Sequence, residues 1–150
     1  MSTCWWSSTP FVPAPRVAPP ETCLFAIGDV HGHADELEAL HTVIVEQARR
    51  SDARRKLVVY LGDYVDRGPA TVRTVELLVA QSRLDDGLQR VFLAGNHDQF
   101  VVELLAPSDG VDRSFVTMWQ DNGGDSTLGQ FGVEDYGRLA MADDMAGLSQ

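Results

Sequence analysis

Three short motifs in the sequence combine glycine with side chains that can bind metal ions, and they read "GDVHG" (28–32), "GDYVDRG" (62–68) and "GNHD" (95–98). Carboxylate, imidazole and amide groups together suit divalent ions of intermediate hardness, such as manganese, iron or zinc. Two carboxylates, Asp29 and Asp63, allow a bridged pair of ions about 3.5 to 4 Å apart, which can stabilise the attacking and leaving oxygens of phosphoryl transfer. Arg67 adds a planar fork suited to phosphate oxygens. The residue types therefore indicate hydrolysis of a phosphate ester.

Each motif directly follows a short apolar run, and these runs are "TCLFAI" (22–27), "KLVVYL" (56–61) and "RVFLA" (90–94). The runs are continuous rather than alternating, which predicts strands that are buried on both faces. Because the carboxyl ends of parallel strands lie along one edge of a sheet, we expect the motif side chains to meet in one crevice, on the loops beyond the strands. Glycines 28, 62 and 95 are expected to allow sharp turns beside that crevice.

The two segments that connect these runs have helical patterns. The first carries acidic residues early and arginines late, which complements a helix dipole. The second starts at Gly68-Pro69, and proline suits a first helical turn. The expected apolar faces are Leu37, Leu40, Ile44 and Ala48 in the first helix and Val72, Val75, Leu78 and Val79 in the second. The order strand-helix-strand-helix-strand predicts an α/β fold with a parallel sheet and right-handed crossovers.

The rest of the chain has weaker signals. Five of the seven prolines lie in residues 1–20, which predicts a disordered tail, and we expect the folded domain to span 21–150. After residue 100, "QFVVELLA" and "VDRSFVTMWQD" predict two helices, and "NGG" (122–124) supplies positive-φ residues that can cap the second. Residues 133–150 predict a weak helix.

Composition narrows the class of protein. The formal charge of −10 argues against non-specific binding to nucleic acid, which depends on lysine and arginine. No apolar stretch approaches the roughly 20 residues of a membrane helix. Two cysteines, Cys4 and Cys23, are poor evidence for a disulfide framework, and the N-terminal residues lack the pattern of a secretory signal. We therefore expect a cytoplasmic protein with no membrane partner.

The three motifs, in this order and at these spacings, amount to a resemblance to a known family. Residues 22–98 resemble the first half of the calcineurin-like metallophosphoesterases, and the motifs are similar to those of the phosphoprotein phosphatase branch. The resemblance implies that the chain forms the parallel βαβαβ half of an α/β sandwich, on which a second sheet packs. A further tract is similar to a stretch in bacterial members of this branch and consists of Trp119, Asn122, Gly123, Gly124, Thr127 and Leu128.

The resemblance implies a dinuclear metal site, with manganese as the expected ion and iron or zinc as alternatives. Asp29 and His31 would bind the first metal, and Asp63 would bridge both metals. Asn96 would bind the second metal and also touch the substrate phosphate.

The resemblance also implies how the substrate is handled. Arg67 would hold the phosphate, and His97 would protonate the leaving oxygen while water attacks. Asp66 would orient His97. Without the resemblance, Asp66 and Arg67 could also form a salt bridge that only shapes the loop.

Two departures from the family pattern bear on the expected function. Ala94 stands where eukaryotic protein phosphatases have arginine, and Asp98 stands in place of glutamate. Both favour a bacterial serine/threonine phosphatase or a diadenosine tetraphosphate hydrolase. The family's second metal takes two further histidines, whereas this sequence has no histidine after His97. We therefore expect a truncated member, and the alternative to an enzyme is a fragment that only binds metal and phosphate.

Three other features have structural interpretations. His33 is expected to face solvent at the start of a helix, and His41 is expected to lie on the surface. Asn122-Gly123-Gly124 is expected to form a turn rather than a substrate contact. The expected substrates are a phosphorylated protein or a small phosphoester.

Overall fold

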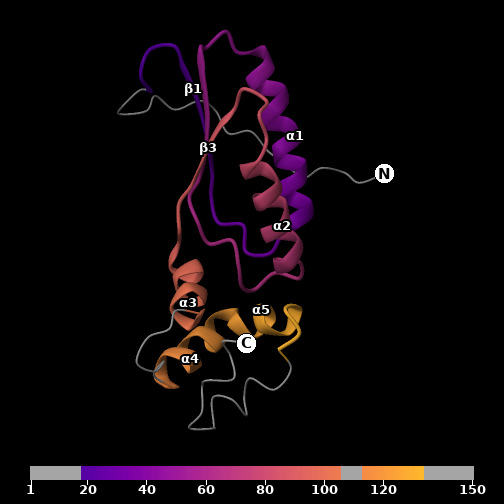
Figure 1. The fold of residues 1–150 in the computed structure, drawn as a ribbon, viewed down its shortest axis with the longest axis vertical. Coiled ribbons are helices and arrows are strands. Elements are labelled where there is room, and N and C mark those ends of the chain that lie inside the picture. Colours follow the sequence, from indigo (N-terminus) through magenta and orange to yellow (C-terminus); the bar gives the residue numbers. More distant parts are fainter. Residues whose placement is uncertain (1–17, 106–112, 134–150) are drawn as a thin grey trace, which may run out of the picture.

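The computed structural model describes residues 18–105 and 113–133 (Figure 1). The elements follow the order β1 (Thr22–Ile27), α1 (Ala34–Arg50), β2 (Arg55–Tyr60), α2 (Thr71–Ser82), β3 (Gln89–Phe92), α3 (Asn96–Leu105), α4 (Arg113–Trp119), η1 (Gln120–Gly124) and α5 (Asp125–Gln130). The predicted weak helix after residue 133 and nearly all of the predicted N-terminal tail lie outside the described residues.

The sheet has three parallel strands in the order β1-β2-β3. Ile27 pairs with Tyr60, and Tyr60 pairs with Phe92, so the three strands end at the same edge. In Figure 1 this edge points downward, and α3, α4 and α5 lie beyond it. The predicted α/β class and the βαβαβ order are confirmed.

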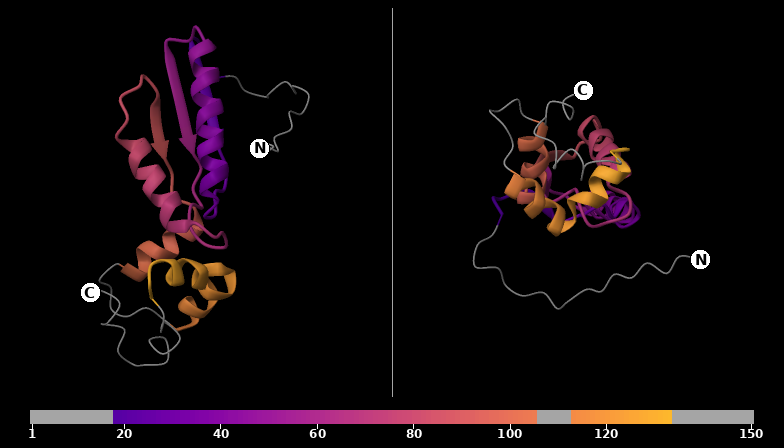
Figure 2. Two further views of the ribbon diagram at one scale, coloured as in Figure 1. Left: turned by 90° about the vertical axis from the view of Figure 1, so that its right-hand side faces the viewer. Right: turned by 90° about the horizontal axis from the view of Figure 1, so that it is seen from below.

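Helices α1 and α2 cover the same face of the sheet (Figures 1 and 2). The core between these helices and the strands is built from Ile27, Val30, Leu37, Ile44, Val58, Tyr60 and Leu78, with Phe25 and Phe92 packed against it. Tyr60 and Phe92 stack with their ring centroids 4.5 Å apart. Among the described residues, none of the helices has both the length and the apolar character needed to cross a membrane.

The helical faces follow the predictions in part. Leu37, Ile44 and Ala48 are buried in α1 as expected, whereas Leu40 is exposed. In α2 the buried residues are Thr71, Thr74 and Leu78, and the predicted Val79 is exposed. The helix begins at Thr71, two residues after Pro69, and Thr71, Thr74 and Leu78 are its most deeply buried residues. The predicted Val72 and Val75 are half-buried.

The opposite face of the sheet is a finding that corrects the sequence analysis. The strands were expected to be buried on both faces, but within the described residues the helices cover only one. Side chains alternate along a strand, so every second residue points away from α1 and α2. Four leucine and valine side chains of this uncovered face or of its lower rim are 40 to 50% exposed, namely Leu24, Leu61, Val91 and Leu93.

His41 is a second correction, because it is buried rather than on the surface. Its Nε2 lies 3.0 Å from the hydroxyl of Tyr60, beneath α1. Burial, followed by the positive charge of Arg90, lowers the pKa of His41 from 6.5 to about 4, and Glu38 opposes this only weakly. The folded protein therefore holds a neutral histidine in its core.

The His41 pKa predicts how stability depends on pH. Between pH 6.5 and pH 4 the unfolded chain protonates His41 and the folded chain does not, so the free energy of unfolding falls as the pH falls through this window. The contribution amounts to roughly 3 kcal/mol at most. Urea unfolding of wild type and His41→Gln between pH 7 and pH 4.5 measures it. We expect a shallower pH dependence in the variant; parallel curves would contradict the assignment.

The uncovered sheet face predicts self-association of this chain, because a large exposed apolar patch favours contact with a second apolar surface. Val91→Lys should lower the apparent mass in sedimentation velocity at micromolar concentration. Val79→Lys is the matched control, since Val79 on α2 is 43% exposed and Val91 is 40% exposed. Equal behaviour of the two variants would show that the sheet face does not mediate association.

Candidate metal and phosphate site

The carboxyl ends of β1 and β2 bring three potential ligands together. Atoms of Asp29, His31 and Asp63 that could bind a metal all lie within 4.8 Å of one another. Asp29 is exposed, His31 is buried at the edge of the sheet, and Asp63 is half-buried. The sequence analysis predicted that these three residues converge, and the parallel register supplies the reason.

His31 is oriented for a ligand by its ring hydrogen bond. Its Nδ1 lies 2.7 Å from the carbonyl oxygen of Val65, so Nδ1 carries the proton and donates it. The lone pair is then on Nε2, on the other side of the ring. A histidine that donates one nitrogen to a carbonyl and offers the other is the usual arrangement of a metal ligand.

The backbone around this edge is unusual. Five non-glycine residues among those described have positive φ, and four of them are His31 (42°), Asp63 (55°), Asp66 (71°) and Arg67 (67°). Such conformations cost about 1 to 3 kcal/mol each and persist only where surrounding contacts enforce them. The loops at this edge are therefore held in strained shapes by contacts elsewhere.

Two glycines allow the loops to approach closely. A Cβ on Gly62 would lie 2.1 Å from the nitrogen of Gly95, and a Cβ on Gly95 would lie 2.1 Å from Oδ1 of Asp63. Gly28 differs from this pattern, because a Cβ there would meet nothing within 4 Å. The close approach of the loops therefore depends on Gly62 and Gly95 and not on Gly28.

Asp98 is a structural residue that the sequence analysis did not single out as one. Its carboxylate accepts the backbone N–H groups of Asp63 (2.7 Å), Tyr64 (2.9 Å) and Gly95 (2.9 Å). It therefore joins the loop after β2 to the start of α3. Burial and the nearby charge of Asp98 raise the pKa of Tyr64 to about 12, and the Tyr64 hydroxyl donates to the carbonyl of Leu93.

Asn96 and His97 lie in the first turn of α3 and not on a loop, which corrects their expected placement. The backbone N–H of His97 donates to Oδ1 of Asp63 at 3.0 Å. Asn96 is exposed at the same end of the helix. The rigid helix thereby fixes His97 relative to the potential bridging carboxylate.

His97 and Asp66 form a buried pair. His97 Nδ1 lies 2.6 Å from Oδ2 of Asp66, with His97 only 3% and Asp66 0% exposed. Arg67 lies between the two histidines: one guanidinium nitrogen donates to Nε2 of His31 and the other to Nε2 of His97, both at 2.9 Å. Among the described residues, Asp66 makes its side-chain ion pair with His97 and not with Arg67.

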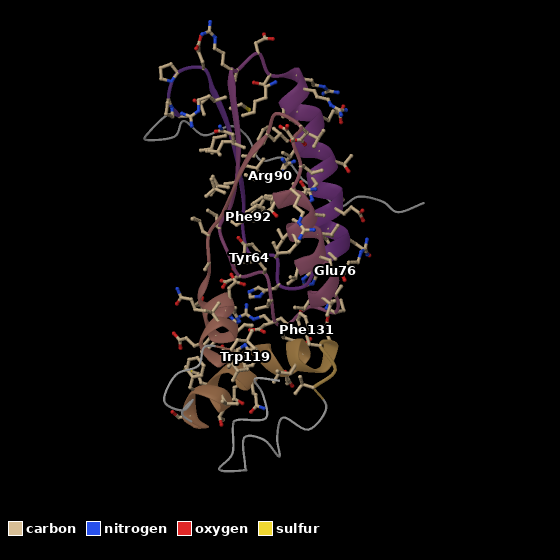
Figure 3. The ribbon with its side chains drawn as sticks, in the orientation of Figure 1. Tyr64, Glu76, Arg90, Phe92, Trp119 and Phe131 are labelled. Atoms are coloured by element: carbon tan, nitrogen blue, oxygen red, sulfur yellow. The ribbon has the colours of Figure 1, made fainter. Side chains whose placement is uncertain are left out.

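The tract between 119 and 127 also reaches this pair, although it is far away in sequence. The indole N–H of Trp119 donates to Oδ2 of Asp66 at 2.7 Å, and the hydroxyl of Thr127 donates to Oδ1 at 2.6 Å. Figure 3 shows Trp119 among the helices below the strands. The "NGG" segment lies in η1, where Gly123 has the expected positive φ (101°) and interrupts the helical backbone between α4 and α5.

The donor set fits a divalent metal ion. Two carboxylates and a neutral imidazole nitrogen suit manganese, iron and zinc alike. An ion at Nε2 of His31 would use the lone pair that Arg67 now contacts. The guanidinium would then be free to bind phosphate oxygens beside the ion.

The fold and the site are typical of α/β proteins that can hold a metal ion at the carboxyl edge of a parallel sheet. The comparisons with known proteins agree. Residues 24–144 match the family described as "Calcineurin-like phosphoesterase". The chain belongs to this family.

Two curated relatives are similar to parts of this chain. Serine/threonine-protein phosphatase 1 of Salmonella typhimurium is 29% identical over 104 residues, which cover 68% of this chain and 39% of the relative. The symmetrical bis(5'-nucleosyl)-tetraphosphatase of Klebsiella pneumoniae is 38% identical over 90 residues, which cover 60% of this chain and 27% of the relative. The chain thus spans less than two fifths of either relative.

The ligand geometry predicts one tight divalent site on this chain, because three potential ligands surround the first position, whereas only Asp63 and Asn96 are expected to serve the second. Calorimetric titration with manganese should give about one tight ion per chain. Asp29→Asn should weaken binding about tenfold or more, in the range of ligand and near-ligand losses. His33→Gln is the control, since His33 is exposed and its ring contacts backbone carbonyls. Two tight ions per chain would contradict the ligand count.

Proposed function

We propose that this chain carries the first-metal half of a metal-dependent phosphoesterase site and acts on phosphate monoesters. The observation that supports this best is the meeting of two groups at one sheet edge. The Asp29, His31 and Asp63 triad lies beside the His97 and Asp66 pair, and Arg67 contacts a histidine of each.

In this proposal Asp29, His31 and Asp63 hold the first ion, and Asp63 and Asn96 contribute to a second. The ions, when bound, would polarise the phosphate and activate water for attack on phosphorus. Manganese is the ion we propose. Arg67 binds the phosphate through its planar fork and sets the position of the phosphorus relative to His97.

His97 acts as the general acid in the proposed reaction. Its Nδ1–H stays bound to Asp66, so the acid proton would be carried on Nε2. Arg67 now donates to this nitrogen, and it would release the nitrogen when its guanidinium turns to the phosphate. As the oxygen of water bonds to phosphorus and the P–O bond to the leaving group breaks, the Nε2 proton passes to the leaving oxygen, so that an alcohol leaves rather than an alkoxide. Asn96 and Arg67 hold the phosphate during this transfer.

The proposed substrate class is a phosphoserine or phosphothreonine protein in the cytoplasm. The relative from Salmonella, which carries the name of such a phosphatase, supports this class. The second candidate is hydrolysis of dinucleoside tetraphosphates, which the higher identity to the Klebsiella relative favours. A third is binding of metal and phosphate without turnover, which the single group of three potential ligands among the described residues favours.

The proposed reaction is tested by hydrolysis of an aryl phosphate and an alkyl phosphate by this chain with manganese. We expect slow, metal-dependent turnover that Asp63→Asn removes almost entirely. General acid catalysis contributes about 10² to 10⁴-fold and matters most for poor leaving groups. His97→Asn should therefore reduce hydrolysis of the alkyl phosphate more than that of the aryl phosphate.

The matched control for both variants is His33→Gln, which removes an exposed histidine near the site. Wild-type rates in Asp63→Asn would refute the metal-dependent mechanism. Equal losses on both substrates in His97→Asn would show that His97 is not the acid. Binding of manganese without any turnover would favour the third candidate.

A further inference from the structure

The segment from Trp119 to Gln130 encloses the Asp66 carboxylate, and this arrangement goes beyond the metal and phosphate roles proposed above. Asp66 is completely buried, and Trp119, Thr127 and His97 are each at most 3% exposed. A buried carboxylate is costly unless its lone pairs are satisfied. Three side-chain donors satisfy Asp66: His97 and Trp119 at Oδ2, and Thr127 at Oδ1.

The two carboxylate oxygens of Asp66 accept from different side chains. Oδ2 receives the ring N–H of His97 (2.6 Å) and the indole N–H of Trp119 (2.7 Å), so both rings are aligned on one atom. The hydroxyl of Thr127 fixes Oδ1 at 2.6 Å, which prevents rotation of the carboxylate. The plane of Asp66, and through it the ring of His97, is therefore set by residues 53 and 61 positions away in sequence.

The same segment supports the strained backbone of Asp66 and Arg67, both of which have positive φ. Thr127 Oγ1 accepts the N–H of Asp66 at 2.9 Å, and the carbonyl of Gly123 accepts the N–H of Arg67 at 3.3 Å. Gly123 itself has φ 101°, and a Cβ there would lie 2.9 Å from Cγ of Arg67. The segment thus contacts the backbone of both residues at close range.

The helical segment that carries Trp119 and Thr127 is irregular between these two residues. Between α4 and α5 the chain bends at Gly123, whose φ of 101° is not helical, and Trp119 before the bend and Thr127 after it both donate to Asp66. A Cβ on Gly124 would lie 2.4 Å from the indole ring, so the ring packs directly on the backbone of this turn.

We propose that the Trp119 indole N–H and the Thr127 hydroxyl are positioning groups for general acid catalysis: they fix the Asp66 carboxylate, which in turn fixes the tautomer and direction of the His97 ring. This inference rests on the proposed role of His97 as the acid. It assigns a function to a segment that was expected to form only a turn. The hydrogen bonds that Trp119 and Thr127 donate go to Asp66 and not to the proposed metal ligands Asp29 and His31 or to Arg67.

Gln130 provides a control, because it helps to dock the segment but does not bind Asp66. Gln130 donates to the carbonyl of Gly68 at 2.9 Å and accepts the N–H of Thr71. Gln130→Ala therefore weakens docking of α5 against the same loop while it leaves the donors to Asp66 intact. A purely structural role of the segment would make Gln130→Ala behave like the variants of Trp119 and Thr127.

The test compares Thr127→Val, Thr127→Ser, Trp119→Phe and Gln130→Ala in the full chain. Thr127→Val keeps the side-chain shape and removes the hydroxyl, and Thr127→Ser restores it. We expect Thr127→Val and Trp119→Phe to lower kcat for an alkyl phosphate roughly tenfold, a part of the general acid contribution. KM should change less than about twofold, aryl phosphate hydrolysis should fall less, and Thr127→Ser should recover the loss.

A second readout does not require turnover. Long-range ¹H–¹⁵N correlation spectra of the histidine rings, recorded with a chelator present, report which ring nitrogen carries the proton. We expect His97, assigned by its loss in His97→Asn, to be protonated at Nδ1 alone in wild type, Thr127→Ser and Gln130→Ala. In Thr127→Val and Trp119→Phe its two nitrogen shifts should move toward each other as the second tautomer becomes populated.

The two readouts separate this inference from the proposed function. If no phosphate ester is hydrolysed by any form, the proposed function fails and the ring-nitrogen shifts alone decide whether Trp119 and Thr127 position His97. Unchanged His97 shifts in Thr127→Val and Trp119→Phe would overturn the inference. The same changes in Gln130→Ala would overturn it as well, because they would reflect loosening of the whole segment.

Discussion

The buried Asp66 carboxylate is the constraint on which the arrangement of this site depends. It has no exposed surface, so its oxygens must be satisfied by protein donors. Those donors come from α3, from the end of α4 and from α5. The helices beyond the sheet therefore pack against the loop after β2 that carries Asp66. This packing places His97 and Arg67 near the carboxylates at the ends of β1 and β2.

A second carboxylate supports the same edge from the other side. Asp98 binds three backbone N–H groups and so fixes the loop that carries Asp63 against the start of α3. Positive φ angles at His31, Asp63, Asp66 and Arg67 show that these loops are held away from their preferred conformations. Strain of this kind persists where surrounding contacts over-determine the backbone, and the two aspartates supply such contacts.

The two faces of the sheet differ in how far the described residues cover them. Helices α1 and α2 bury one face, while leucine and valine side chains remain exposed on the other. The chain spans 39% and 27% of the length of the two curated relatives. The described residues therefore contain one covered face of the sheet, a complete Asp29, His31 and Asp63 triad, and the proposed acid with its positioning groups.

The sequence by itself determined the α/β class, the three strands and the convergence of the three motifs, because apolar runs and glycine-aspartate endings are local signals and parallel strands share an edge. Tertiary structure decided the rest. Whether His41 is buried, and whether a strand is covered on one face or two, depends on neighbours that no local pattern encodes. The contacts of Trp119, Thr127 and Asp98 were equally hidden, since a hydrogen bond between residues 35 to 61 positions apart is created only when the chain folds.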